Sequence, residues 1–76
     1  MDFSATIHPN PALDQFWLSS NGPALLQITD LQGQVLLEQK VETQQQIDIS
    51  GLPKGLLICT LNGIQAKQVI KLLKLI

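Results

Sequence analysis

Apolar and polar residues alternate along much of this chain with the period of two that is typical of half-buried β-strands. The clearest case is 35–42, where Val35, Leu37 and Val41 fall on one face and the charged Glu38 and Lys40 fall on the other. The pattern predicts seven short strands, at residues 5–8, 15–20, 25–29, 35–42, 47–50, 56–61 and 65–72.

The stretch 47–61 contains the most informative pattern. Ile47 and Ile49 alternate with polar residues, and an almost unbroken apolar run follows at 56–61. So short an apolar run predicts a central strand that is covered on both faces, as in a sandwich. Between the two, Gly51-Leu52-Pro53-Lys54-Gly55 interrupts any ladder or helix and predicts a tight corner.

Other turn signals separate the remaining strands. Pro9-Asn10-Pro11 closes the first extended segment, because two prolines fix φ and remove two backbone donors. Gly33 can supply the positive φ of a short hairpin with a bulge, and 43–46 is a polar connection. Asn62-Gly63 is a strong signal for a two-residue hairpin turn.

The last segment, residues 65–76, fits two structures. As a strand it places Lys67, Val69 and Lys71 on one face; as a helix it forms an apolar stripe opposite the lysines, which would suggest binding to a membrane surface. The preceding Asn-Gly signal and the Val69-Ile70 pair favour a strand to about Leu72. Residues 73–76 stay open between strand, helix and disorder.

Seven short strands with close turn signals predict an all-β fold, a small antiparallel β-sandwich in a single domain over residues 1–76. Its predicted core comprises Phe16, Leu18, Ile28, Val35, Leu37, Ile47, Ile49, Leu57, Cys59 and Leu61. A chain of 76 residues leaves no room for a second core, and 45% hydrophobic content favours a folded domain over a disordered segment.

The composition excludes most chemistry. With one His, one Cys and no Tyr, the sequence has no catalytic constellation, no metal-ligand cluster and no cofactor motif. A net charge of −1 gives no basic face for nucleic acid. Cys59 is expected to be a buried hydrophobe, and His8 a solvent-facing strand end. Trp17 falls on a polar face, as an edge contact or, alternatively, as a platform for a glycan.

Three segments carry a resemblance to a known family. Taken in order, His8-Pro9-Asn10-Pro11, Ile28-Thr29-Asp30-Leu31-Gln32-Gly33-Gln34-Val35 and Ile47-Asp48-Ile49-Ser50-Gly51-Leu52-Pro53-Lys54-Gly55-Leu56 resemble the C-terminal sorting domain of the type IX (Por) secretion system of Bacteroidetes. The resemblance covers about residues 7–71. It implies an immunoglobulin-like sandwich and a non-enzymatic signal that directs a cargo across the outer membrane.

The resemblance also implies partners and sites. The partners would be the type IX translocon, a sortase that removes the domain at the cell surface and can attach the cargo to anionic lipopolysaccharide, and the cargo domain that precedes the module. The protein would be secreted or surface-bound, by way of the periplasm. Recognition residues would be Pro53, Gly55, Leu57, Lys67 and Lys71, and the structural motif residues Pro9, Asn10, Pro11, Gly33, Gly51 and Leu52.

Two departures from the family pattern leave alternatives open. Leu57 stands where the family usually has Tyr, which favours a core role, and Lys67 and Lys71 could keep an edge strand soluble instead of being recognised. Leu72 to Ile76 extend beyond the usual end, with four apolar side chains for which the core has little room. Such an edge predicts a homodimer through the last strand. A glycan-binding or spacer module of a secreted enzyme is the alternative function. Met1-Asp2-Phe3 lacks the basic start of a signal peptide, as expected if a longer cargo carries that signal.

Overall fold

The computed structural model describes residues 3–64 and 66–76, and this part of the chain is all-β without a helix. Seven strands follow one another: β1 (Ala5–His8), β2 (Gln15–Ser20), β3 (Ala24–Thr29), β4 (Val35–Val41), β5 (Gln44–Asp48), β6 (Gly55–Asn62) and β7 (Lys67–Lys74). The all-β prediction is confirmed. No helix long and apolar enough to cross a membrane occurs among the described residues.

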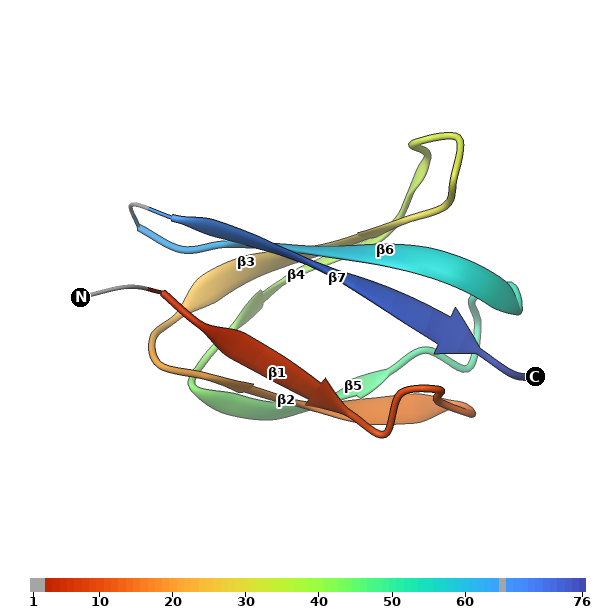
Figure 1. Cartoon of the computed structure of the whole chain (residues 1–76), viewed down its shortest axis with the longest axis horizontal. Helices are drawn as coiled ribbons and strands as arrows, with labels where there is room; N and C mark the ends of the chain where they lie inside the picture. The colour runs from red at the N-terminus through yellow and green to blue at the C-terminus, as the bar shows by residue number, and fades with distance from the viewer. Residues whose placement is uncertain (1–2, 65) are drawn as a thin grey trace.

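The strands form two antiparallel sheets that face each other (Figure 1). One sheet has the order β1-β2-β5 and the other the order β4-β3-β6-β7. Strands β3, β6 and β7 lie together as C, F and G do in an immunoglobulin sandwich, with β4 added at the edge. The start of β1 and the end of β7 lie toward opposite ends of the long axis (Figure 1).

The core lies between the two sheets and is built by every second residue of the strands. It consists of Ala5, Ala12, Phe16, Leu18, Leu26, Ile28, Val41, Ile47, Ile49, Leu57, Cys59, Leu61 and Leu72. Most of the predicted core is confirmed, and Leu37 packs against it from a partly buried position.

Val35 is the one predicted core residue that lies outside, with 49% of its surface exposed. The cause is a β-bulge: β4 pairs Leu37 with Ile28 but Val35 with Thr29, so that Leu36 is the extra residue. Paired residues share a face, and Ile28 faces the core while Thr29 faces outward. The bulge therefore turns Val35 to the outer face.

The polar connection predicted at 43–46 is wrong, because β5 runs from Gln44 to Asp48. It is an edge strand that pairs only with β2. Gln44 and Gln46 point outward, and Ile47 is the one fully buried side chain of the strand. An edge strand that buries so little needs few apolar residues, so hydrophobic alternation does not reveal its first half.

The last segment is a strand, as favoured, and it continues to Lys74. The prediction that the core has little room for the tail is wrong for Leu72, which is fully buried. The predicted start at Gln65 lies outside the described residues. Of residues 73–76, which the sequence left open, Leu73 and Lys74 belong to the strand and pair with Leu56 and Gly55.

The turn between β6 and β7 is longer than the two residues predicted from Asn62-Gly63. Asn62 pairs with Lys67, and the N–H of Gly63 donates to the carbonyl of Ala66 at 2.8 Å. The position of Gly63 is set by packing: a Cβ there would lie 2.9 Å from Cδ1 of Phe3. The close contact with the Phe3 ring, sixty positions earlier in the chain, thus explains a glycine here better than the local turn preference does.

The turn between β3 and β4 follows the prediction. Gly33 has φ +89°, and the Asp30 carboxylate accepts from the N–H groups of Gln32 and Gln34, each at 2.9 Å. An acidic side chain that satisfies the turn's own donors is a usual way to fix such a loop.

Candidate functional site

The Pro9-Asn10-Pro11 segment is bound to the last strand. The side-chain amide of Asn10 donates to the carbonyl of Lys71 at 2.8 Å and accepts from the N–H of Leu73 at 3.1 Å. Both peptide bonds that precede these prolines are cis. Asn10 therefore makes the same two contacts with β7 that a neighbouring strand would make.

The backbone of Ala12 continues this contact. Its N–H donates to the carbonyl of Leu73 at 2.8 Å, and its carbonyl accepts from the N–H of Leu75 at 2.9 Å. Ala12 forms an isolated parallel bridge with Lys74 and is itself fully buried. We refer to Asn10 and Ala12 together as the edge clasp. The structural role expected for Asn10 is thus a contact with β7.

Gln68 makes a second contact between the two sheets. Its side-chain amide accepts from the N–H of Ala5 and donates to the carbonyl of Ala5, both at 2.7 Å. Gln68 lies on the inward face of β7, where a partly buried amide needs such partners. Sequence reasoning missed this residue, although a polar residue among inward-facing apolar ones was a signal that could have found it.

The Gly51–Gly55 corner connects β5 to β6. Gly55 has φ +117°, a conformation that favours glycine, whereas Gly51 has no positive φ. Leu52 packs partly buried against the core, and Pro53 is exposed. In this corner, Gly55 is therefore required by the backbone conformation, Leu52 packs against the core, and the Pro53 ring is exposed.

Leu57 does not reach the surface. It is 2% exposed and pairs with the buried Leu72 on the inner face of the four-stranded sheet. Its side chain cannot contact a partner while the sandwich is intact, which agrees with the core role inferred from the missing Tyr hydroxyl.

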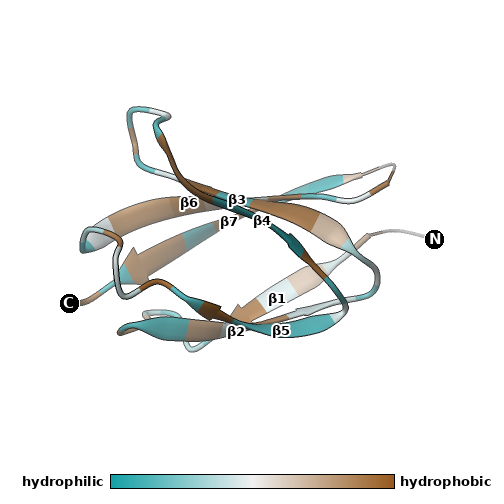
Figure 2. Cartoon of the chain, turned by 180° about the vertical axis from the view of Figure 1, so that it is seen from behind, coloured by the Kyte–Doolittle hydropathy of each residue, from teal (hydrophilic) through white to brown (hydrophobic). Residues whose placement is uncertain are grey.

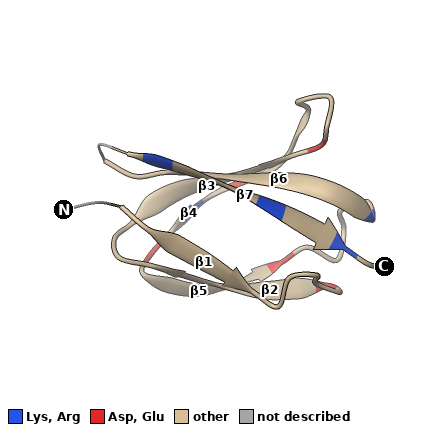
Figure 3. Ribbon diagram, in the orientation of Figure 1, with Lys and Arg blue, Asp and Glu red and all other residues tan. Residues whose placement is uncertain are grey.

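Lys67 and Lys71 are both exposed on the outward face of β7, as predicted from their spacing. Figure 3 shows the lysine positions along β7 in blue. Four residues of strand separate them, or roughly 13 Å. No ion pair involves either lysine among the described residues. Lys74, by contrast, faces inward, is 4% exposed, and donates from Nζ to the carbonyl of Ile76.

The structure does not bring all the predicted recognition residues together. Gly55 pairs with Lys74 at one end of the β6–β7 hairpin, and Asn62 pairs with Lys67 at the other. These ends are seven residues of β6 apart, or roughly 24 Å. Lys71, which lies opposite Ile58, is between them.

No arrangement suited to catalysis or metal binding is seen in residues 3–64 and 66–76. No group of three or more His, Cys, Asp or Glu side chains that could hold a metal lies there. Burial raises the pKa of the Cys59 thiol to about 12, so this cysteine is a poor nucleophile. Asp48 is exposed, and the Ser50 N–H that it accepts at 2.9 Å lowers its pKa.

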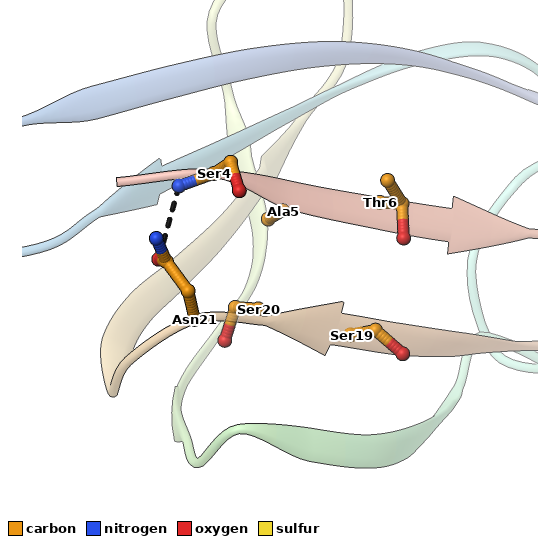
Figure 4. A pocket seen from close by; sticks show the side chains of 6 residues that line it. All are labelled: Ser4, Ala5, Thr6, Ser19, Ser20 and Asn21. Atoms are coloured by element: carbon orange, nitrogen blue, oxygen red, sulfur yellow. Dashed lines mark hydrogen bonds between the residues drawn. The ribbon is translucent and has the colours of Figure 1, made fainter. Parts of the chain in front are cut away.

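A shallow depression lies on β1, β2 and the turn that follows β2 (Figure 4). It is lined by Ser4, Ala5, Thr6, Ser19, Ser20 and Asn21. The Ser4 N–H donates to Oδ1 of Asn21 at 3.0 Å, and the Asn21 N–H donates to the Ser4 carbonyl at 3.1 Å. The lining offers hydroxyl and amide groups without a general acid or base.

Comparison with known proteins identifies the family of this β-sandwich domain. The family described as the secretion system C-terminal sorting domain matches residues 6–75. The chain belongs to this family. The sorting domain is the C-terminal signal for type IX secretion, found in Bacteroidetes, and it directs export across the outer membrane to the cell surface or the medium. A search among curated proteins gives no significant match.

This assignment favours sorting over the glycan-binding or spacer alternative. Trp17 is 42% exposed on the outer face of the three-stranded sheet, where it pairs with His8 and Gln46. Membership in the family implies contact with the type IX machinery and with a cargo N-terminal to the domain, and it indicates a signal rather than an enzyme.

Proposed function

We propose that the type IX translocon recognises the sorting domain in its folded state through Lys67 and Lys71. The observation that supports this is their geometry: both lysines are exposed on one face of β7 and have no acidic partner among the described residues. Two cations held roughly 13 Å apart by a strand fit a groove that carries acidic side chains. Pro53 and Gly55 contribute a fixed corner beyond Lys71.

We further propose that a surface sortase removes the domain after passage through the periplasm and the outer membrane, and attaches the cargo to anionic lipopolysaccharide. The first described residues support a cut N-terminal to Phe3. The Phe3 ring lies against Gly63, and Ser4 exchanges two hydrogen bonds with Asn21. Proteases rarely cut segments that are held in a fold, so Phe3 and the residues after it are poor cleavage sites.

The test is export of a reporter fused N-terminally to the full chain in a bacterium that has the pathway. Lys67→Ala combined with Lys71→Ala should leave the reporter in the cell, while the melting temperature stays within a few degrees of the parent. Lys40→Ala is the matched control, since Lys40 is an exposed lysine on the same sheet at its opposite edge, β4. Normal export of the folded double variant would show that the two lysines serve only solubility.

We also propose a homodimer through the last strand. The edge clasp limits the part of β7 that is free to pair. The clasp occupies the Lys71 carbonyl, both backbone groups of Leu73 and the Leu75 N–H. Because backbone groups alternate along a strand, the same edge offers Lys67 and Val69 for pairing. Two residues make a short ladder, so we expect sedimentation to show a dimer only at high concentration. A tight dimer at low micromolar concentration would mean that the clasp opens.

A further inference from the structure

The two outer faces of the sandwich differ in chemistry. Outward residues of the three-stranded sheet are mostly polar and include Thr6, His8, Gln15, Trp17, Ser19, Gln44, Gln46 and Asp48. Outward residues of β6 and β7 on the other sheet are half apolar: Leu56, Ile58, Val69 and Leu73 alternate or pair with Thr60, Asn62, Lys67 and Lys71. Figure 2, which colours the residues of both faces alike, shows β6 largely brown and β5 largely teal.

The four apolar residues border Lys71 along β7 and toward β6, where Thr60 is the polar diagonal neighbour. Ile58 is its cross-strand partner, Val69 and Leu73 are its same-face neighbours on β7, and Leu56 is the partner of Leu73. The exposed fractions are 41% for Leu56, 54% for Val69 and 40% for Leu73. We name these five residues the Lys71 patch. A cluster of exposed aliphatic side chains around one cation is uncommon for a solvated face and indicates a contact surface.

We propose that the Lys71 patch docks a protein surface of the secretion machinery that presents a carboxylate within a ring of aliphatic side chains. This inference rests on the proposed function and adds to it the chemistry of the partner. Lys71 has no charged partner within the described chain, and the four apolar residues beside it would exclude water from an ion pair formed there. Aliphatic contact then supplies affinity, and the carboxylate supplies specificity.

Lys67 has a different role in this arrangement. Its cross-strand neighbour is the exposed Asn62, and among the described strand residues on its face the apolar neighbour is Val69. An ion pair at Lys67 would remain in solvent and be screened by salt. The two lysines are therefore distinguishable: loss of Lys71 should be costly at any ionic strength, and loss of Lys67 mainly at low ionic strength.

Two other occupants fit less well. An anionic membrane gains little from the exposed Lys40, Lys67 and Lys71, because they are spread over the sheet and Glu38 lies on the same outer face. A second copy docked about a two-fold axis through the patch would place two Lys71 side chains close together in one interface, with like charges opposed. A carboxylate-bearing partner would both pair with Lys71 and cover the apolar residues beside it.

The experiment compares isosteric variants in the reporter fusion. Val69→Thr together with Leu56→Gln should lower export about tenfold, and Lys71→Gln at least as much, with melting temperatures near that of the parent. Val35→Thr is the matched control, because Val35 is a similarly exposed valine (49%) on the far strand of the same sheet. A photo-crosslinking residue at position 69 should label an outer-membrane component of the machinery, and the label should disappear with Lys71→Gln. A photo-crosslinking residue at position 46, on the outer face of the three-stranded sheet, should not label this component.

The other possible results contradict either this inference, the proposed function or both. If Lys71→Gln blocks export while Val69→Thr with Leu56→Gln exports normally, the lysine is recognised without an apolar contact, and this inference fails although the proposed function stands. If all these variants, and Lys67→Ala with Lys71→Ala, export normally, both fail. Equal labelling from position 46 would assign contact to the other sheet. Binding of the purified fusion to vesicles with one-third phosphatidylglycerol, weakened by Lys71→Gln, would make the patch a membrane site.

Discussion

Replacing Asn10 by Ala should destabilise the sorting domain at the open edge of the sandwich. This side chain joins the loop after β1 to β7 through the carbonyl of Lys71 and the N–H of Leu73. Alanine removes both bonds and leaves the backbone of β7 to be solvated by water at these two groups. The Ala12 bridge beside it would then be held by its own two bonds alone.

The magnitude follows from the two bonds. Each is expected to contribute about 0.5–1.5 kcal/mol, and water can replace part of this at an exposed site, so the loss should be about 1–2 kcal/mol. A domain of 76 residues has a free energy of unfolding of about 4–11 kcal/mol. The melting temperature should therefore fall by about 5–15 °C.

Urea denaturation measures the global loss, and amide hydrogen exchange locates it. We expect faster exchange at Leu73 and Leu75, with the β3–β6 amides changed only by the global loss. Asn10→Asp separates the two bonds, because its carboxylate can accept from Leu73 but cannot donate to Lys71. The Leu73 amide should stay protected in that variant although stability falls. Asn62→Ala is the control, since Asn62 is an exposed asparagine for which the described structure has no side-chain hydrogen bond.

The reasoning would be refuted by a loss below about 0.5 kcal/mol in Asn10→Ala with unchanged exchange at Leu73. Such a result would mean that Ala12 alone holds the loop on β7. A loss as large in Asn62→Ala would refute it differently, since the effect would then belong to any asparagine replaced at this surface.

Three further predictions concern the core, the corner and the thiol. Leu57→Ala should cost about 2–5 kcal/mol in urea denaturation, and Val35→Ala less than about 0.5 kcal/mol; equal losses would contradict the bulge assignment. Gly55→Ala should cost about 1–3 kcal/mol because of its positive φ, whereas Gly51→Ala, with open space around it, should be nearly neutral. Because the folded pKa of Cys59 is raised from 9.0 to about 12, its contribution is complete below pH 9 and is lost between pH 9 and 12, by up to about 1.4 kcal/mol per unit. Cys59→Ala should show a flatter stability profile there, and an equally steep one would assign the loss to other groups.

Much of the fold could be predicted because the inward face of each central strand is apolar. The unbroken apolar run also located β6, but its outward face is not covered as predicted, since Leu56 is 41% exposed there. The prediction failed where a local irregularity changes the face. At Val35 the bulge inserts Leu36, and hydrophobicity alone cannot indicate that the period has shifted by one. It failed also at Gln44, since an edge strand with one buried side chain carries almost no hydrophobic signal.

The exposed lysines of the candidate site could be predicted from their spacing, but the contacts that close the sandwich could not. Asn10 bonds to residues 61 and 63 positions away, and Gln68 bonds to Ala5 at a separation of 63. Such pairings follow from the tertiary arrangement of β1 beside β7, which no local pattern encodes. The same holds for Gly63, whose glycine is required by the Phe3 ring and not by its own turn.

If the proposed recognition holds, strand β7 separates it from stability by the direction of its side chains. Gln68 and Leu72 point inward, to the inter-sheet contact and the core, while Lys67, Val69 and Lys71 point outward. Because successive side chains lie on opposite faces, an outward substitution can change the surface without creating a cavity. Loss of export in an outward variant therefore reports on the partner, provided that the melting temperature is unchanged. An inward variant such as Leu72→Ala should instead lose export and stability together, and restoring stability at a lower growth temperature should restore its export but not that of Lys71→Gln.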